Sequence, residues 1–436
     1  MVRTPPFHGG NMGSNPVGIT NKKKYPPLRR VFLYIFTILQ NKLFIVFVDK
    51  FSNQVFLLGM KIGMTNISVD YGNSILSVSN SVLMYFNGAA EYSTLPELDA
   101  ILNKNYKNVV LMVIDCMGTF ILKQNLPQNS FLNRHILKNI SSVFPPTTAA
   151  ATTTFHCGLP PLHSGWLGWM SYFPQYNKII ELFRNTEFYS GKPISEPAPS
   201  ESLIRYDSIY SKIVKKNPDV KYYKIFPLFD PDGVNSFEEM CERIVQTTKK
   251  NSDRKIISAY WTEPDHSIHQ YGVKSPEIKD ILTDIEKQVV KMSNKLEDTI
   301  VIISADHGAI NVEEIYLNKF PDLCETFDRP PALEARFVTF FVKPNRRDNF
   351  ENLFREYFGK DFVLFTKKDF LSSCILGTNR MHQIVPSLLG DFVAIAIKDK
   401  SLRYSTGEKI FSPLKADHAG FTPEEMTVPL IVLEEK

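Results

Sequence analysis

Short apolar runs rich in β-branched residues alternate with longer amphipathic stretches from Asn108 onward. The clearest runs are VVLMVI, IISAY, TIVIISA and VPLIVL, at residues 109–114, 256–260, 299–305 and 428–433. Buried strands of a parallel sheet have this continuous apolar character, because both of their faces are covered. The pattern therefore predicts an α/β fold, with a mostly parallel central sheet and helices on both of its faces.

The stretch between the second and third runs repeats with a helical period. Ser275 can cap this helix, and Pro276 suits its first turn. Its apolar positions share one face, at Ile278, Ile281, Leu282, Ile285, Val289, Met292 and Leu296. Strand, helix and strand then form a crossover unit, which places the carboxyl ends of both strands at the same edge of the sheet.

A different block of sequence occupies residues 330–400. It contains the strand-like runs RFVTFFVKP and DFVAIAIKD, with a helical pattern near residues 350–358 between them, and no cluster of His or Asp. We interpret it as a small inserted α+β cap domain. The larger core domain then comprises residues 65–329 and 401–436.

Residues 1–64 have the composition of a leader. A basic flank, with Lys22–Lys24 and Arg29–Arg30, precedes an apolar run at residues 31–48. A charged side chain such as Lys42, near the centre of that run, would cost about 2.5–3.5 kcal/mol in a membrane. We expect a disordered leader and a cytoplasmic protein, with a weak membrane anchor at residues 31–48 as the alternative. A natural start at Met60 or Met64 is a further alternative, because the orderly pattern begins only after them.

Overall charge says little about partners, and the cysteines suggest no special site. Lys and Arg outnumber Asp and Glu by 50 to 46, and the excess falls mostly in the first fifty residues, so no stripe for duplex nucleic acid is expected. The five cysteines are odd in number and contain no CxxC pair, which argues against a disulfide framework or a thiolate zinc site. We interpret all five as small buried apolar residues: Cys116, Cys157, Cys241, Cys324 and Cys374.

Three strand-like segments are each followed by an aspartate, at Asp115, Asp265 and Asp306. A single aspartate in such a place is usually a helix cap or a turn residue. Ligands of open α/β sheets bind at the carboxyl edge, however, so three aspartates at this edge indicate a site.

Histidines accompany these aspartates. His269 follows Asp265 by four residues, His307 follows Asp306 at once, and a further Asp-His pair at residues 417–418 precedes the last strand. A four-residue spacing on a helix directs both side chains to the same side. Carboxylates mixed with imidazoles suit zinc, manganese or a related divalent ion.

The segment FPPTTAAATTTFHCGLPP adds a hydroxyl group. Its prolines disfavour a helix before Thr147, and the alanines and threonines that follow can begin one. A hydroxyl at Thr147 or Thr148 would then lie at a helix N-terminus, where backbone N–H groups attract phosphate. A simple N-cap threonine is the alternative.

The order VIDCMG, FPPTTAAATTTFHCGLPP, EPDHSIHQYG, ADHG and DHAGFTPEEMTVPLIVL resembles the type I phosphodiesterase and nucleotide pyrophosphatase family of the alkaline phosphatase superfamily. The resemblance extends from Lys107 to Leu433. It implies that Thr148, ten residues before Gly158, is the catalytic nucleophile, with Thr147 as the lesser candidate. It also implies two divalent ions, zinc or alternatively manganese, one held by Asp115, Thr148, Asp306 and His307 and the other by Asp265, His269 and His418.

The function implied by this resemblance is hydrolysis of a small-molecule phosphodiester or nucleotide pyrophosphate through a phosphothreonine intermediate. A phosphomonoesterase or phosphonate hydrolase is the alternative within the superfamily; a phospho-group transferase or an inactive interaction protein is the alternative outside it. One departure concerns specificity: Trp169 appears where the family has an asparagine that binds a phosphate oxygen. It lies close to Trp166, Leu167 and Tyr172, which we interpret as core packing, with base stacking as the alternative.

Overall fold

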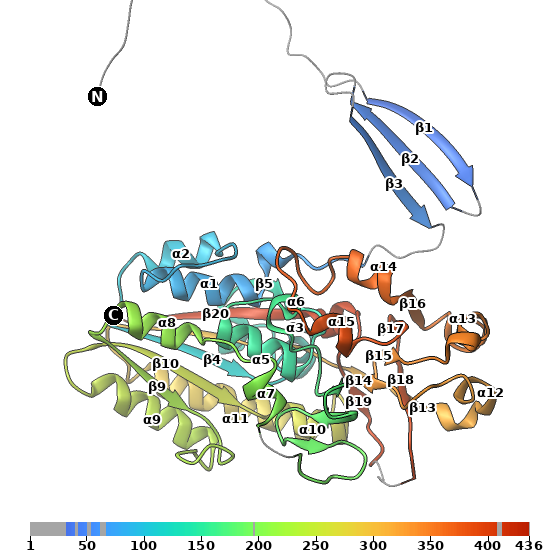
Figure 1. The fold of residues 1–436 in the computed structure, drawn as a ribbon. Helices are drawn as coiled ribbons and strands as arrows, with labels where there is room; N and C mark the ends of the chain where they lie inside the picture. The colour runs from blue at the N-terminus through green and yellow to red at the C-terminus, as the bar shows by residue number, and fades with distance from the viewer. Residues whose placement is uncertain are drawn as a thin grey trace, which may run out of the picture. The chain divides into compact units, whose positions relative to one another are not determined.

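The computed structural model describes residues 67–194, 197–407 and 412–435, together with the backbone of three earlier strands (Figure 1). The chain divides into two compact units, Met1–Thr65 and Asn66–Lys436. In the first unit, β1 (Phe32–Leu39), β2 (Lys42–Asp49) and β3 (Gln54–Lys61) form an antiparallel sheet.

Strands β1 and β2 cover most of the apolar run at residues 31–48, and the remaining residues of that run lie outside the described part. Within the described part, none of the helices combines the length and apolar character needed to cross a membrane. The leader, its anchor and the cellular compartment stay predictions.

The second unit is built on a six-stranded sheet with the order β5-β20-β11-β4-β10-β9. The four parallel neighbours β11, β4, β10 and β9 carry most of it, whereas β20 runs antiparallel to both β11 and β5. The bounds are β4 Asn108–Ile114, β5 Ile136–Ser141, β9 Val220–Ile225, β10 Arg254–Trp261, β11 Thr299–Ser304 and β20 Thr427–Glu435. The prediction of a mostly parallel central sheet is confirmed, and its four clearest strands are β4, β10, β11 and β20.

The register of the parallel strands aligns their carboxyl ends. In it Ile114 of β4 pairs with Trp261 of β10, and Val113 pairs with Ser304 of β11. The segments that follow these three strands therefore leave the sheet at one edge, as the crossover argument predicted.

Two groups of helices cover this sheet. Helices α1 (Ile75–Tyr85), α2 (Pro96–Leu102), α5 (Thr148–Cys157) and α8 (Ile209–Lys216) pack together in one group. The other group comprises α3 (Thr119–Asn125), α9 (Phe237–Lys249) and α11 (Pro276–Ser293). Figure 1 shows α1 and α2 above the sheet and α9 and α11 below it. As predicted, the Ser275 hydroxyl caps α11, accepting from the amide of Ile278.

A second sheet of seven strands has the order β16-β17-β15-β14-β6-β7-β8. Its strands are β6 Met170–Phe173, β7 Lys178–Glu181, β8 Thr186–Glu187, β14 Ala332–Leu333, β15 Phe337–Phe340, β16 Phe362–Thr366 and β17 Phe392–Ala396. Helix α13 (Arg347–Phe358) packs its phenylalanines against this sheet. This sheet joins strands from both sides of residue 330. The division into a core at residues 65–329 and 401–436 and a cap at residues 330–400 stays a prediction.

The remaining elements are short. They are η1 Tyr71–Asn73, α4 Phe131–Arg134, α6 Pro161–Ser164, α7 Pro199–Ser202, α10 Asp265–Tyr271, β12 Ile310–Asn311, β13 Glu313–Tyr316, η2 Leu317–Lys319, α12 Pro321–Cys324, η3 Pro344–Arg346, α14 Lys367–Ser372, α15 Val385–Leu388, β18 Lys400–Arg403, β19 Ala416–Asp417 and α16 Pro423–Met426.

The cysteines differ in exposure. Cys116, Cys157 and Cys241 are buried, Cys324 is half-buried and Cys374 is exposed. The interpretation of all five as buried residues is therefore wrong for Cys374, and holds only in part for Cys324. Cys374 lies in the turn after α14, and connecting segments of this kind run over the surface.

Candidate active site

Asp115, Asp306 and His307 meet at the carboxyl edge of the central sheet, where they follow β4 and β11. The Nε2 atom of His307 lies 3.4 Å from Oδ1 of Asp115 and 3.6 Å from Oδ2 of Asp306. The same nitrogen lies 3.2 Å from the hydroxyl of Thr148, the first residue of α5. The segments after β4 and β11 and the first residue of α5 thus bring one imidazole, two carboxylates and one hydroxyl together.

A second group forms around Asp265, the first residue of α10. One helical turn later, Nε2 of His269 lies 3.5 Å from Oδ2 of Asp265. His418, which follows β19, brings its Nε2 atom to 3.9 Å from the other oxygen of Asp265. The rings of His307 and His418 stack with centroids 4.0 Å apart, so the two groups are neighbours. All seven predicted site residues therefore lie together.

These donor atoms have the spacing of metal ligands. Ligand atoms about 2.0–2.2 Å from a tetrahedral zinc lie about 3.3–3.6 Å from one another. The distances from His307 to Asp115 and Asp306, and from His269 to Asp265, fall in that range. Asp115, Asp306 and His307 form one group that could hold an ion, and Asp265, His269 and His418 form another.

Several polar atoms of the cluster are buried without a hydrogen-bond partner among the described residues. They are Oδ1 of Asp115, Oδ1 of Asp265, Oδ2 of Asp306 and Nδ1 of His418. Buried polar groups are normally hydrogen-bonded, and buried charges are paired or bind a metal. The unpartnered atoms and the mixed oxygen and nitrogen donors fit divalent cations.

The ionisation of the cluster reflects this crowding. Burial raises the pKa of Asp115 well above its ordinary value, and the charges of Asp306 and Asp265 raise it further. Burial also raises the pKa of Asp306. Burial would raise the pKa of Asp265 too, but the neighbouring imidazoles, that of His269 first, lower it. Three carboxylates in one buried place repel each other, and bound cations would relieve this repulsion.

Backbone carbonyls orient two of the imidazoles. Nδ1 of His269 lies 2.8 Å from the carbonyl oxygen of Ala416, and Nδ1 of His307 lies 3.1 Å from that of Gly308. An imidazole that donates from Nδ1 presents the lone pair of Nε2, here toward the aspartates. The carboxylate of Asp417 accepts from Ser401 and Arg403.

The two candidate threonines have different surroundings. Thr147 is the N-cap of α5 and is buried, and its hydroxyl donates to Oε1 of Glu334 over 2.8 Å. Thr148 is partly exposed, and its hydroxyl faces His307. Only Thr148 has its hydroxyl against the acidic and imidazole cluster.

Comparison with known proteins agrees with this geometry. Residues 109–387, more than half of the chain, match the type I phosphodiesterase / nucleotide pyrophosphatase family. The chain belongs to this family. The family lies in the alkaline phosphatase superfamily and comprises hydrolases that act on phosphoester bonds, so the resemblance inferred from the sequence is confirmed.

Two human members of the family are similar over part of the chain. Ectonucleotide pyrophosphatase/phosphodiesterase family member 1 is 27% identical over 201 residues, which cover 42% of this chain and 21% of that protein. Family member 5 is 29% identical over 104 residues, covering 22% of each. The matched segments thus span about a fifth of the length of these relatives.

Solved structures of the superfamily share the fold. Murine ectonucleotide pyrophosphatase / phosphodiesterase 5 aligns with a TM-score of 0.55 and 17% identity, covering 74% of this chain and 87% of that one. An inactive threonine-to-alanine variant of it in complex with AMP gives 0.56 at 16% identity, with the same coverage. Phosphonoacetate hydrolase from Sinorhizobium meliloti 1021, in complex with phosphonoformate, gives 0.54 at 14% identity, covering 75% and 91%.

Beside the family's expected residues, the structure adds two that sequence reasoning missed. Oε1 of Glu334 accepts from the Thr147 hydroxyl and, over 2.6 Å, from the amide of Trp169. Burial raises the pKa of Glu334 to about 7. Tyr260, near the end of β10, donates to Oδ2 of Asp115. Glu334 lies in a loop and Tyr260 lies within a strand, and neither is part of a recognisable sequence motif, so the sequence offered no reason to select them.

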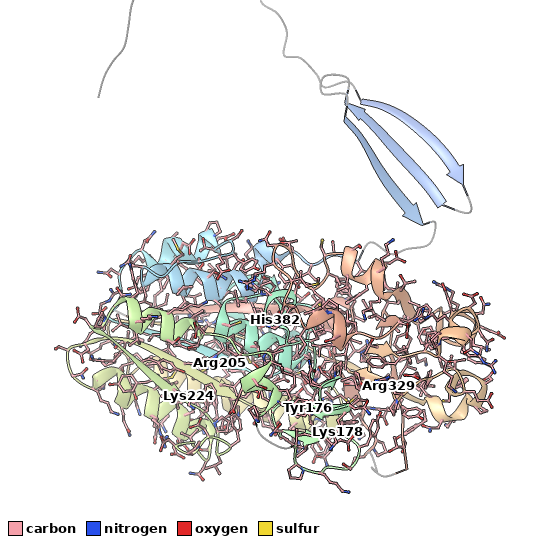
Figure 2. All side chains as sticks on the ribbon, viewed as in Figure 1. Tyr176, Lys178, Arg205, Lys224, Arg329 and His382 are labelled. Carbon is pink, nitrogen blue, oxygen red and sulfur yellow. The ribbon has the colours of Figure 1, made fainter. Side chains whose placement is uncertain are left out.

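The aromatic residues after α6 mostly pack within the protein. The indole of Trp169 donates to Glu181 over 2.7 Å, and that of Trp166 donates to the carbonyl of Ile204 over 3.1 Å. The guanidinium of Arg329, labelled in Figure 2, lies 4.5 Å from the ring centroid of Tyr172. Trp166 also lines a cavity of about 460 Å³ with Ser200, Glu201, Arg205 and Tyr206. Packing therefore explains most of this aromatic segment.

Proposed function

We propose that this protein is a metal-dependent hydrolase of phosphodiester or nucleotide pyrophosphate bonds, with Thr148 as its nucleophile. The observation that carries the proposal is the Thr148 hydroxyl, 3.2 Å from His307 within a cluster of three aspartates and three histidines. Membership of the family supports the reaction class. In the murine relative, a threonine-to-alanine variant is inactive and binds AMP, which supports a threonine nucleophile and a nucleotide substrate.

The N-terminus of α5 supplies a binding place for the phosphoryl group. First-turn N–H groups have no partner within a helix, and they attract anions together with the helix dipole. The N-cap Thr147 makes no side-chain hydrogen bond to these amides, because its hydroxyl donates to Glu334 instead. The amides next to Thr148 thus remain available for phosphoryl oxygens.

The cluster divides into two sets of metal ligands. Asp115, Asp306, His307 and the Thr148 oxygen would hold one divalent ion, and Asp265, His269 and His418 would hold the other. Zinc or manganese suits these donors, and a bound pair supplies Lewis-acid stabilisation of the threonine alkoxide and of the leaving oxygen. The carbonyls of Ala416 and Gly308 keep two of the imidazoles oriented for this task.

The reaction then runs in two displacements at phosphorus. The Thr148 oxygen gives up its proton to solvent and attacks phosphorus, while the bond to the alcohol or nucleotide leaving group breaks opposite to it. The leaving oxygen takes up a proton from solvent. Water next attacks the phosphothreonine, breaks its P–O bond and restores the Thr148 hydroxyl. Transfer to an alcohol in place of water would make the protein a transferase.

Phosphonate hydrolysis is the second candidate, because phosphonoacetate hydrolase shares the fold over 75% of this chain. A phosphomonoesterase is the other alternative within the superfamily. An inactive interaction protein is disfavoured, since all seven side chains of the predicted site are present and lie together.

Paired substrates test the proposal. Purified full-length protein, loaded with zinc or manganese, is assayed on an aryl phosphate monoester, the matching diester, a dinucleotide pyrophosphate and phosphonoacetate. We expect the diester or pyrophosphate to be cleaved fastest, and chelation to abolish this activity until the metal is restored. Inertness toward both of them, or turnover that survives complete removal of metal, would refute the proposal.

A further inference from the structure

Cys116 lies where the two ligand sets meet. It follows Asp115 at the end of β4, and its side chain is fully buried. The sulfur of Cys116, one carboxylate oxygen of Asp265 and one ring nitrogen of His307 all lie within 4.8 Å of one another. Because Asp265 belongs to one set and His307 to the other, the sulfur borders both.

A second observation shows that this place is suited to a cation. Oδ1 of Asp115 and Oδ2 of Asp306 are buried, without hydrogen-bond partners in the described part of the chain, and both lie within 3.6 Å of the same nitrogen of His307. The amide of Cys116 donates to the other oxygen of Asp306 over 3.0 Å. That bond leaves Oδ2 of Asp306 turned toward the cluster.

We propose that the thiolate of Cys116 is an additional ligand of the metal centre and makes the site selective for zinc over manganese. The proposal rests on the metal centre of the proposed function. A thiolate lies about 2.3 Å from zinc, and oxygen or nitrogen ligands lie about 2.1 Å from it. In a tetrahedral site a sulfur ligand therefore lies about 3.6 Å from an oxygen or nitrogen ligand, so atoms within 4.8 Å of one another would have to close in by up to about 1.2 Å to share an ion.

The selectivity follows from the softness of sulfur. The other seven ligands are oxygen and imidazole donors, which suit manganese as well as zinc, whereas thiolates favour zinc. Binding replaces the thiol proton by the ion and releases that proton to solvent. No oxidant or reductant takes part.

The chain offers a well-matched set of variants. Cys116 has a φ of 60°, a value that glycine adopts without strain, so Cys116→Gly removes the sulfur and is compatible with the backbone. Cys157 is equally buried at the end of α5, and its sulfur contacts the carbonyl of Leu159 at 3.8 Å. Cys157→Ser therefore controls for loss of a buried thiol away from the cluster.

The test uses full-length protein loaded with Co²⁺, whose bond to sulfur produces a charge-transfer absorption band in the near ultraviolet. We expect this band in the wild type and in Cys157→Ser, and its loss in Cys116→Gly at a similar cobalt content. We also expect Cys116→Gly to lose about tenfold or more in zinc affinity, with little change for manganese. Circular dichroism verifies that the variants are folded.

A wild type that binds cobalt without the band, a Cys116→Gly variant that keeps it, or equal loss of zinc and manganese affinity would overturn the proposal. Turnover of the diester is measured on the same samples. A sulfur band without turnover leaves the ligand assignment standing and removes the proposed reaction. Metal-dependent turnover without the band leaves the proposed reaction standing and removes Cys116 as a metal ligand.

Discussion

At the scale of single residues, neighbouring side chains of one type have different partners. Thr147 and Thr148 are adjacent at the start of α5, but one hydroxyl donates to Glu334 and the other faces His307. The difference arises because Thr147 is still extended, whereas Thr148 has entered the helix. Two adjacent residues thus have different roles: the Thr147 hydroxyl is buried and structural, and the Thr148 hydroxyl is the candidate nucleophile.

Replacing Thr148 by alanine should lower turnover by about 10⁴-fold or more, because it removes the attacking oxygen. Metal content should stay largely intact, since six carboxylate and imidazole ligands remain. Steady-state kinetics and elemental analysis measure the two quantities. Thr152→Ala, one turn along the same helix, is the control, because its hydroxyl donates to the carbonyl of Thr148 over 2.6 Å. Full activity in Thr148→Ala would move the nucleophile elsewhere, and Thr147 would be tested next.

Glu334 should make substrate binding depend on pH. Its pKa, raised to about 7 by burial, leaves the carboxyl neutral below that pH and anionic above it, with the charges of Asp417 and Arg403 as opposing influences. An anion beside Thr147 repels a phosphate, so KM for an anionic substrate should rise above pH 7. Glu334→Gln keeps an acceptor for Thr147 and Trp169, and should abolish that rise. The idea fails if the glutamine variant shows the same pH profile of KM as the wild type.

At the scale of elements, buried polar contacts connect the second sheet to the segment that carries His418. Arg336, just before β15, is fully buried and forms a two-pronged ion pair with Glu425 at 2.7 and 2.8 Å. Glu425 also accepts from the amide of Gly420 and from Thr422. The carboxylate of Glu425 therefore holds the turn after His418, and the guanidinium of Arg336, next to a strand of the second sheet, balances its charge.

Breaking this pair should destabilise the fold by about 3–5 kcal/mol, because Arg336→Met leaves the buried carboxylate of Glu425 unpaired. Denaturant unfolding measures the change. The double variant Arg336→Met with Glu425→Gln should cost less than the single one, since no charge is left buried alone. Arg355→Met, which removes a half-exposed pair with Glu351 on α13, should stay within about 1 kcal/mol of the wild type. Equal effects of Arg336→Met and Arg355→Met would contradict this account.

At the scale of the whole molecule, the site concentrates negative charge at one edge of the sheet. Asp115, Asp265 and Asp306 come from segments far apart in sequence, and burial with mutual repulsion raises the pKa of Asp115. Without cations, this repulsion acts against the packing of the strand ends. Folding and metal binding should therefore be coupled.

Chelation should lower the melting temperature by several degrees. A ligand present at a thousandfold excess over its Kd stabilises the native state by about 4.1 kcal/mol, and removing it forfeits that stabilisation. Thermal unfolding followed by circular dichroism, with EDTA and after zinc is added back, measures the shift. Asp115→Asn should show a smaller effect, because one repelling charge and one ligand are gone. An unchanged melting temperature after verified metal removal would argue against a structural role for the ions.

Much of this protein could be predicted from local pattern. Strands that are buried on both faces require unbroken apolar runs, so β4, β10, β11 and β20 were visible in the sequence, as was α11 with its Ser275 cap. The aspartates and histidines were found because chain direction alone sends the ends of parallel strands to one edge. These features depend on the spacing of apolar residues and on the order of segments along the chain, and both can be read from a single sequence.

Contacts between side chains that are far apart in sequence could not be predicted. The partners of Thr147, Trp169 and Cys116 lie far away in sequence, and no spacing or period announces them. The second sheet likewise joins strands from residues 170–187 and 332–396, which composition had separated. Local periodicity was enough to predict the main strands of the central sheet, their order along the chain and the types of candidate ligand. Which hydroxyl and which carboxyls face the candidate metal site could be seen only in the packed chain, because it depends on contacts between residues far apart in sequence.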